Sequence, residues 1–263
     1  MKIRVNLCPI ETKEKSAEIR VNARPIQLNV FGAIGLAVLI LAVGFCLLAP
    51  SGISGTTPPT VIIDPGHGGQ DIGAVEPSEA LKEKDLTLAL AQKLAEALER
   101  DGVARVLLTR KEDQTLSLDD RAGFASNRGG DLLISVHVGN SFRPAAQGFS
   151  LYHWSPAFRD PVAAPMTAPA VPWENGQLPY WEQSRKLAGL LERELRQSLP
   201  WPSGGVTEAD VYLLRRVPMP AVLLELGSLS YPAEATDLAR PSFQEVVARA
   251  VAAAVRQFRG LRP

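Results

Sequence analysis

The 263-residue sequence predicts an α/β fold, a twisted, mostly parallel sheet flanked by helices and preceded by a single N-terminal transmembrane helix. From residue 60 onward, short apolar runs alternate with amphipathic segments, which is typical of strands alternating with helices in a parallel sheet. Before them, residues 30–49 form a run of twenty apolar residues and glycines. At roughly 1.5 Å per residue, a helix of that length crosses about 30 Å of hydrocarbon.

The individual elements follow from the spacing of apolar residues. Leu86, Leu90, Leu94 and Leu98 recur at helical spacing, and Ser117 stands where a helix N-cap is expected. On these grounds strands are expected at 61–63, 105–109, 131–137, 148–152, 211–214 and 221–226, and helices at 85–100, 117–127, 183–199 and 241–259. Ligands of such sheets bind beyond the carboxyl ends of the strands, so those ends are where a site is expected.

The N-terminal charge pattern predicts the domain organisation. Residues 1–27 carry six basic and three acidic side chains, and residues 28–49 carry no charge. Because positive flanks stay cytoplasmic, we expect a cytoplasmic tail at 1–27, a membrane anchor at 28–49, a linker at 50–59 and an extracytoplasmic domain at 60–263. That places the domain on the periplasmic or cell-wall side of the cytoplasmic membrane. A signal peptide is the alternative, and Pro50 makes a poor cleavage site.

A proline-rich insertion interrupts the strand–helix pattern at about 153–182. It holds six prolines and three of the four tryptophans. A stretch of this length without secondary structure is uncommon inside a compact domain, so it is interpreted as a lid or as a disordered loop. His153, at its start, is interpreted as structural or as part of that lid.

Composition narrows the chemistry available to the domain. The 28 basic and 28 acidic side chains balance, so no global charge favours nucleic acid as a partner. Cys8 and Cys46 are the only cysteines, and both precede residue 60. The domain therefore has neither a disulfide framework nor thiolate ligands, and any metal in it must be held by histidines and carboxylates.

Two of the three histidines fall at predicted strand ends. His67 follows the first strand in the glycine loop DPGHGG, and His137 ends the strand at 131–137. Two carboxylates accompany them: Glu83 just before a helix, and Glu225 inside the apolar run AVLLELGSL. Two imidazoles, one carboxylate and an open position form the ligand set of a hydrolytic zinc site, and a second carboxylate would serve as general base.

Each of these residues also has a structural interpretation. A single histidine in a loop is more often structural than a ligand, and Glu83 alone would be a solvated charge at a helix start. Glu225 alone would be a buried carboxylate paired with Arg110 or Arg121.

Several ordered motifs carry a resemblance that covers residues 60–258. The sequence reads DPGHGGQDIGA, EKDL at a helix start, LLTR, LDDR, ISVH, GF before a strand and PAVLLELGSLS. Together these motifs resemble the zinc-dependent N-acetylmuramoyl-L-alanine amidase family of the amidase 3 type. The resemblance implies hydrolysis of the amide between the lactyl group of N-acetylmuramic acid and L-alanine in peptidoglycan.

The resemblance also implies roles for individual residues. Zinc is expected on His67, Glu83 and His137, with a zinc-bound water as nucleophile and Glu225 as general base and acid. Supporting or substrate contacts are expected from Asp64, Asn140, Arg110 and Arg121. Asp64 either orients His67 or caps its loop, and capping is preferred. The glycines at 66, 68 and 69 are expected to let the backbone approach the metal without a Cβ in the way.

The sequence departs from the family pattern in two places. HVGNS stands where the family has HANS, which shifts the asparagine to Asn140, and LGSLSY replaces LGFLSN. The alternatives left open are a non-catalytic peptidoglycan-binding protein of the same fold and a zinc peptidase of other specificity. Some family members carry an insertion helix that covers the zinc until a partner removes it. The prolines of the insertion argue against a long helix here, and the sequence identifies no activator.

Overall fold

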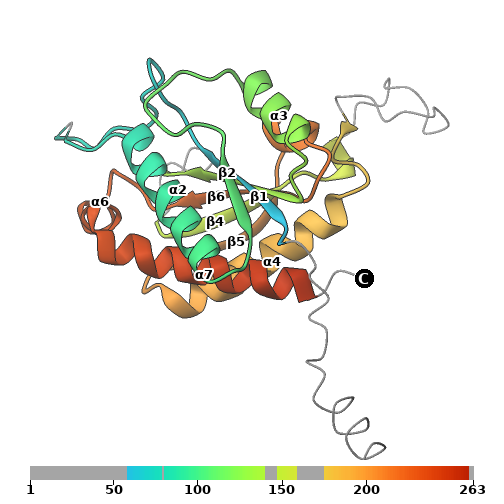
Figure 1. Ribbon diagram of the computed structural model, residues 1–263. Helices are drawn as coiled ribbons and strands as arrows, with labels where there is room; N and C mark the ends of the chain where they lie inside the picture. The colour runs from blue at the N-terminus through green and yellow to red at the C-terminus, as the bar shows by residue number, and fades with distance from the viewer. Residues whose placement is uncertain (1–57, 79, 140–146, 159–174, 261–263) are drawn as a thin grey trace, which may run out of the picture. The chain divides into compact units, whose positions relative to one another are not determined.

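The computed structural model describes residues 58–78, 80–139, 147–158 and 175–260. These segments build a six-stranded sheet in the order β2-β1-β3-β6-β4-β5, flanked by helices (Figure 1). The strands are β1 Thr60–Pro65, β2 Arg105–Leu108, β3 Leu132–His137, β4 Phe149–His153, β5 Ser203–Glu208 and β6 Ala221–Leu226. The α/β prediction is therefore confirmed.

The sheet is mixed. β2, β1, β3 and β6 run parallel to one another, whereas β4 pairs antiparallel with β6 and parallel with β5. The carboxyl ends of β1, β3 and β6 therefore meet at one end of the sheet, which we call the carboxyl edge. The amino-terminal ends of β3 and β6 lie at the other end, the opposite edge, together with the carboxyl end of β4.

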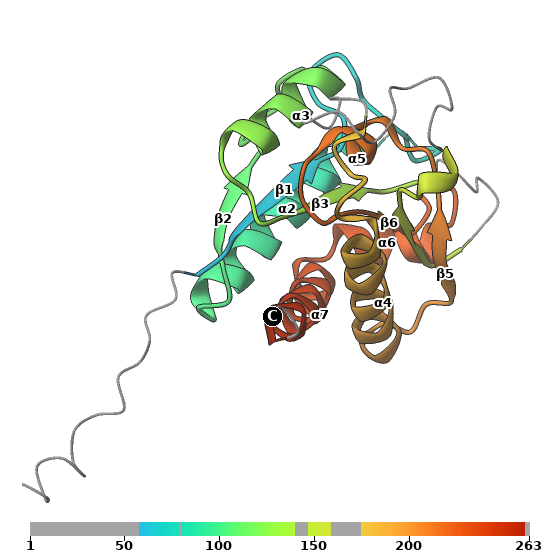
Figure 2. The ribbon, with the colours of Figure 1, turned by 90° about the vertical axis from the view of Figure 1, so that its right-hand side faces the viewer.

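Helices cover both faces of this sheet. They are α2 Glu83–Arg100, α3 Leu118–Asn127, α4 Trp181–Ser198, α5 Tyr212–Arg216, α6 Pro232–Ala239 and α7 Pro241–Gly260, with a short 3₁₀ turn, η1, at Pro156–Phe158. In Figure 2, α2, α4 and α7 lie on one side of the sheet, and α3 and α5 lie on the other. Each face thus has its own apolar cluster.

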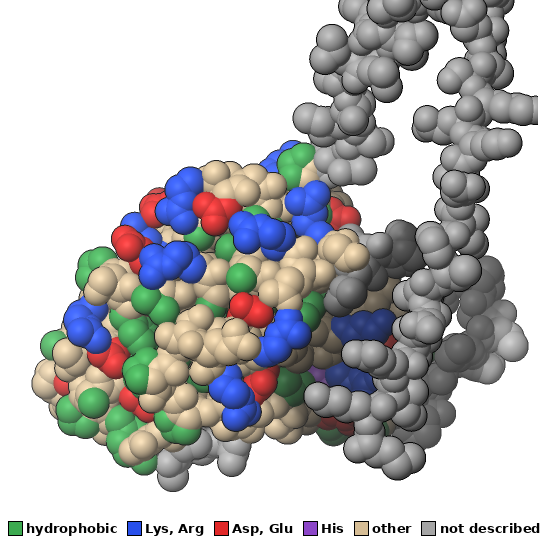
Figure 3. All heavy atoms as spheres, turned by 90° about the horizontal axis from the view of Figure 1, so that it is seen from below, with side chains coloured by type: hydrophobic (Ala, Val, Ile, Leu, Met, Phe, Trp, Pro, Cys, Tyr) green, Lys and Arg blue, Asp and Glu red, His purple; other side chains and the backbone are tan. Residues whose placement is uncertain are grey.

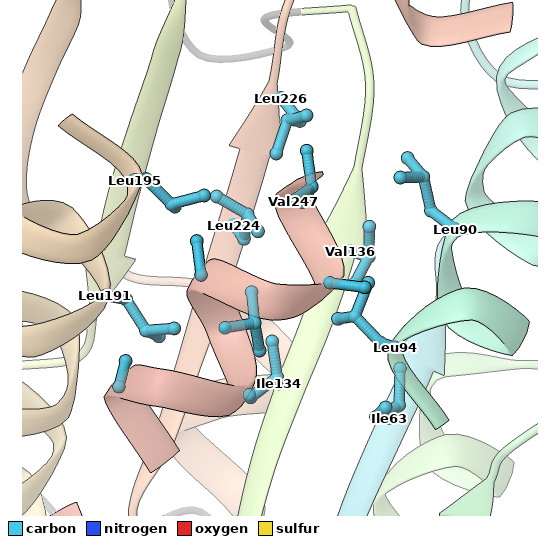
Figure 4. Packing of buried hydrophobic residues seen from close by; sticks show 14 of the residues in the cluster. Ile63, Leu90, Leu94, Ile134, Val136, Leu191, Leu195, Leu224, Leu226 and Val247 are labelled. Atoms are coloured by element: carbon cyan, nitrogen blue, oxygen red, sulfur yellow. The ribbon is translucent and has the colours of Figure 1, made fainter. Parts of the chain in front are cut away.

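The larger apolar cluster joins three helices to the strands. Leu90 and Leu94 of α2, Leu191 of α4 and Val247 of α7 point at strand residues such as Ile134 (Figure 4). All are fully buried, and burial of a large aliphatic side chain stabilises the fold by about 1.5–3 kcal/mol. This packing fixes α2 against β1 and β3, and so fixes the position of Glu83, the first residue of that helix.

The structure corrects one sequence prediction and adds two elements that were not predicted. The segment 211–214, predicted as a strand, forms the N-cap and first residues of α5, because Leu213 and Leu214 turn onto one helical face and are buried there. β5 was not predicted, since its sequence SGGVTE lacks an apolar run and it lies at the sheet edge. The short helix α6 was also missed, although Pro232 at its start is a common helix-initiating residue.

The predicted membrane anchor lies outside the described part of the chain. None of the helices in the described ranges combines the length and apolar composition that crossing a membrane needs. The tail and anchor predicted at 1–49, and most of the linker, fall in segments that the structure does not describe.

On the face drawn in Figure 3, basic and acidic side chains of the described residues are interspersed.

The described ends of the proline-rich insertion attach at the sheet edge where β6 begins. Because β4 runs antiparallel to β6, His153 comes out beside the start of β6. His153 is buried, with its Nδ1 atom 2.9 Å from the Trp154 carbonyl oxygen, in line with a structural role. The lid prediction concerns mainly residues 159–174, which lie outside the description.

The returning end of the insertion is held by one fully buried amide. The Nε2 group of Gln177 donates to three carbonyl oxygens in α5 and the connection to β6, at 3.2, 3.1 and 2.8 Å, those of Leu214, Val217 and Met219. Its Oε1 atom accepts from the hydroxyl of Ser184. A neutral side chain thus satisfies several backbone acceptors that would otherwise be buried without a donor.

Candidate active site

Three predicted site residues meet at the carboxyl edge of the sheet. β1 and β3 are parallel neighbours, and Pro65 at the end of β1 is in register with Val136. His67 follows β1 by two residues, and His137 is the last residue of β3. Glu83 is the first residue of α2, and its backbone N–H donates to the Ala74 carbonyl oxygen at 2.8 Å.

The side chains of these residues converge on one small space. The His67 Nε2 atom lies 3.1 Å from Glu83 Oε2, and the His137 Nδ1 atom lies 3.0 Å from Glu83 Oε1. The imidazole rings stand edge to face, with centroids 4.9 Å apart and an interplanar angle of 78°. One donor atom from each residue lies within 4.8 Å of the others. The carboxylate is 1% exposed, while the rings are 20% and 21% exposed, so the cluster opens on the imidazole side.

The Glu83 carboxylate is held in its ionised form. Backbone N–H groups of Ala74 and Val138 donate to its two oxygens at 2.8 and 2.9 Å. Burial acts to raise the pKa of Glu83, but the hydrogen bond with His137 and the charge interactions with His137 and His67 outweigh it and bring the pKa to about 2. Glu83 therefore offers negatively charged oxygens throughout the neutral range.

His67 presents one ring nitrogen to the cluster and uses the other for orientation. Its Nδ1 atom lies 2.8 Å from Oδ2 of Asp71, a residue four positions along that the sequence analysis did not single out. Burial lowers the pKa of His67, but the interactions with Glu83 and Asp71 raise it by more, so its pKa lies above the usual value. A carboxylate partner on the second nitrogen is the usual arrangement for a metal-binding histidine.

The remaining ring nitrogen of His67 indicates that the cluster suits a metal ion. Nε2 is buried, and at 3.1 Å from Glu83 Oε2 it has no hydrogen bond among the described residues. It faces the same space as His137 Nδ1 and the carboxylate, which together form a donor set of two imidazole nitrogens and one carboxylate. That donor set is the one expected of a hydrolytic metal site.

Two glycines leave room for the cluster. A Cβ at Gly66 would lie 2.5 Å from the His137 ring, and one at Gly73 would lie 2.6 Å from Glu83 Oε2. Gly73 also has φ 64°, a conformation that side-chain-bearing residues rarely adopt. The expected clearance is thus correct for Gly66 but not for Gly68 and Gly69. Their Cβ atoms would meet the backbone at Gln114 and the residue Thr115 instead.

Two buried arginines hold the backbone of the His67 loop. Arg121 donates to the carbonyl oxygens of Pro65 and His67 at 2.7 and 2.6 Å. Arg110 donates to the carbonyl oxygens of Pro65 and Gly66 at 3.2 and 2.9 Å. His67 itself has φ 60°, in the left-handed region, so these bonds maintain a conformation that costs about 1–2 kcal/mol in a residue with a Cβ.

Asp64 supports this arrangement indirectly. It is buried and accepts from three side chains, Arg121 at 2.7 Å, Thr109 at 2.6 Å and Ser135 at 2.8 Å. Burial acts to raise the pKa of Asp64, but the charge of Arg121 and the three hydrogen bonds lower it overall. Asp64 thus neither contacts the His67 ring nor caps the loop, contrary to both predictions. Its contacts show that it fixes Arg121.

Glu225 lies beside the cluster on the neighbouring strand. In the β3–β6 pair it is in register with His137, so both side chains leave the same face of the sheet. Glu225 is fully buried. The alternative pairing with Arg110 or Arg121 is not found, since Arg121 pairs with Asp64 and Arg110 donates to carbonyl and hydroxyl oxygens. Asn140 lies outside the described residues.

The fold and the cluster together define the class of the molecule, an α/β domain with a two-histidine, one-carboxylate group at the carboxyl edge of its sheet. The family model described as N-acetylmuramoyl-L-alanine amidase matches residues 61–257. The chain belongs to this family, as its motifs predicted.

Known proteins support this assignment. The chain is 33% identical over 219 residues to the uncharacterized protein YqiI of Bacillus subtilis, covering 83% of this chain and 92% of that protein. It is 31% identical over 195 residues to the germination-specific N-acetylmuramoyl-L-alanine amidase of the same organism, covering 73% and 76%. A solved N-acetylmuramoyl-L-alanine amidase from Clostridium difficile 630 superposes with a TM-score of 0.64 at 28% identity, covering 78% of this chain and 99% of that one.

Proposed function

We propose that the protein is a zinc-dependent peptidoglycan amidase that hydrolyses the bond between the lactyl group of N-acetylmuramic acid and L-alanine. Family membership supports the reaction class. The observation that carries the metal assignment is the convergence of donor atoms from His67, Glu83 and His137 within 4.8 Å, with the His67 Nε2 atom buried and not hydrogen-bonded among the described residues. These three residues would hold the zinc ion.

The residues around the cluster have complementary chemical roles. When bound, zinc polarises a carbonyl and lowers the pKa of water to about 7. Glu225, in register with His137, takes a proton from the attacking water and passes it to the nitrogen of the departing L-alanine. Asp71 holds the Nδ1 proton of His67, which leaves Nε2 as the ligand atom. Arg110 and Arg121 keep the loop that carries this histidine in place.

We further propose that the domain acts on the outer side of the cytoplasmic membrane. The uncharged run at 28–49 and the basic excess at 1–27 support a single-pass anchor with the catalytic domain on the periplasmic or cell-wall side. Peptidoglycan lies there, so the anchor would keep the domain close to its substrate.

The test compares metal content with hydrolysis in the detergent-solubilised full chain. Glu225→Gln is expected to keep one zinc per chain and to lose about 10²–10⁴-fold in rate, because only the proton-transfer group changes. His137→Ala is expected to lose both zinc and activity. Glu245→Gln, an exposed change on α7, is the matched control and should alter neither.

Mass spectrometry of fragments released from purified peptidoglycan provides the second measurement. The expected products are peptides with a free L-alanine amino group and glycans with a free lactyl carboxylate. Release of fragments in which every lactyl–alanine amide is intact would overturn the proposal and would favour a peptidase of other specificity.

A further inference from the structure

Glu234 is a buried carboxylate that the proposed mechanism does not use. It lies in the first turn of α6, and its two oxygens accept from the backbone N–H groups of Gly148 at 2.7 Å and Ser228 at 2.8 Å. Among the described residues, no cation forms an ion pair with it. Burial therefore raises the pKa of Glu234 above its usual value, although the two N–H groups act to lower it. Burying a carboxylate without a counter-charge costs free energy, and here that cost falls at the turn that follows β6.

The groups that Glu234 binds belong to the turn after the strand that carries Glu225 and to the start of the neighbouring strand. Ser228 lies three residues beyond Glu225 in the chain. Gly148 lies two residues before Ser150, which is in register with Glu225 in the antiparallel β4–β6 pair. Glu234 thus joins the end of β6 to the start of β4 on one side of Glu225.

Gly227 extends this connection to the metal-binding strand on the other side. Its N–H group donates to the Gly148 carbonyl oxygen at 2.7 Å, and its own carbonyl oxygen accepts from the Gly139 N–H group at 3.1 Å. Gly139 lies two residues beyond His137, which is in register with Glu225 in the parallel β3–β6 pair. The turn that Glu234 holds is therefore bonded to both strands that flank the proposed general base.

We propose that Glu234 is a positioning residue for Glu225: it holds the turn after β6, and so keeps the general base in place beside the His67–Glu83–His137 cluster. This inference rests on the proposed amidase function, in which Glu225 transfers the proton. Because a displacement of about 1 Å can cost about 10²-fold in rate, loss of both bonds is expected to lower kcat about ten- to 10²-fold. The proposed zinc ligands keep their own partners, so zinc content should not change.

The first test measures kcat and KM of the detergent-solubilised full chain on a soluble synthetic muramoyl peptide. Glu234→Ala removes both acceptor oxygens and should lower kcat about ten- to 10²-fold with KM within about twofold of wild type. Glu234→Gln keeps one acceptor oxygen and should lower kcat by a smaller factor. Glu182→Ala removes the exposed first-turn carboxylate of α4 and is the matched control. Gln177→Leu, a buried change at the opposite edge, controls for lost stability, and both controls should keep the wild-type kcat.

A second set of variants separates positioning from a purely structural role. If Glu234 acts through Glu225, adding Glu234→Ala to Glu225→Gln should lower kcat by less than about twofold more, because the positioned group is already gone. A structural role alone would lower kcat by the same factor in both backgrounds, and that result would overturn the inference. Wild-type kcat in Glu234→Ala would also overturn it. In either case, hydrolysis by the wild type and its loss in Glu225→Gln would leave the proposed function standing.

Hydrogen–deuterium exchange tests the inference without turnover. The amides of Gly139, Gly227 and Ser228 should exchange about tenfold faster or more in Glu234→Ala, because a hydrogen bond to a charged group is lost at this turn. Glu182→Ala should leave them unchanged. Faster exchange confined to these amides would support Glu234 as the residue that holds the turn even if the wild type hydrolysed nothing. No change, or an increase spread over the whole domain, would overturn the inference.

Discussion

The two edges of the sheet hold buried backbone carbonyls with different chemistry. At the carboxyl edge, Arg110 and Arg121 donate to three consecutive carbonyl oxygens around His67, whereas at the opposite edge the neutral amide of Gln177 donates to three carbonyl oxygens ahead of β6. Both solutions satisfy acceptors that would otherwise be buried without a donor.

The difference between these two anchors lies in what each requires of its surroundings. A buried guanidinium must be balanced, and Asp64 provides that balance for Arg121 at 2.7 Å. Burial and the nearby charge of Arg121 lower the pKa of Arg110, while the charges of Asp64, Asp113 and Asp85 act to raise it, so Asp64 is the carboxylate that both arginines share. Gln177 needs no counter-ion. The arginine anchor is therefore sensitive to charge and pH, whereas the Gln177 anchor has no titratable group.

Removing the counter-ion is expected to have the largest effect. Asp64→Asn leaves Arg121 buried beside a neutral group, which should lower the free energy of unfolding by about 3–5 kcal/mol. Because the same arginine holds the His67 carbonyl, zinc affinity should fall as well. Denaturant unfolding and metal titration measure the two effects. A variant with wild-type stability would show that the arginine anchor does not depend on Asp64.

Removing the neutral anchor should cost less and leave the site intact. Gln177→Leu keeps the bulk of the side chain but leaves three carbonyl oxygens without their donor, which should lower the free energy of unfolding by about 1–3 kcal/mol. Zinc affinity and kcat/KM should equal those of the wild type, because the change lies at the opposite edge. A loss of zinc affinity as large as that of Asp64→Asn would mean that the two edges are coupled.

The smallest expected effect is a difference between the two anchors in how the free energy of unfolding depends on pH. The folded-state pKa of Asp64 lies below 3.8, so its contribution is fully present above pH 3.8 and is lost as the pH falls through the lower folded-state value. The difference in free energy of unfolding between wild type and Asp64→Asn should therefore become smaller as the pH falls through that window, while the difference between wild type and Gln177→Leu stays constant. Unfolding curves recorded at several acidic pH values provide the measurement. Two differences that change with pH in the same way would contradict the prediction.

Sequence patterning located most of the sheet because its strands are short apolar runs. β6 was predicted with its observed bounds, 221–226, since AVLLEL is buried along its whole length. The segment 211–214 was wrong because a run of four mostly apolar residues suits a strand or a helical turn equally well, and only packing in the second cluster decides. β5 carried no such run, and its position depends on pairing with β4.

The proposed ligands could be selected from sequence because histidines are few and the topology brings strand ends together. The supporting residues could not. Asp64 pairs with Arg121 across 57 positions, a partnership that only the folded chain reveals. Asp71 does stand four residues after His67, but its contact depends on the left-handed turn of the loop between them, which the glycines alone do not specify.

The backbone conformation of His67 has a consequence for how this sequence can change. At φ 60° the backbone conformation would be less strained with glycine, whereas metal binding requires an imidazole. A variant library screened for heat resistance alone should therefore enrich glycine at position 67, and the same library screened for lytic activity should retain histidine. At this one position, selection for thermal stability and selection for activity favour different residues.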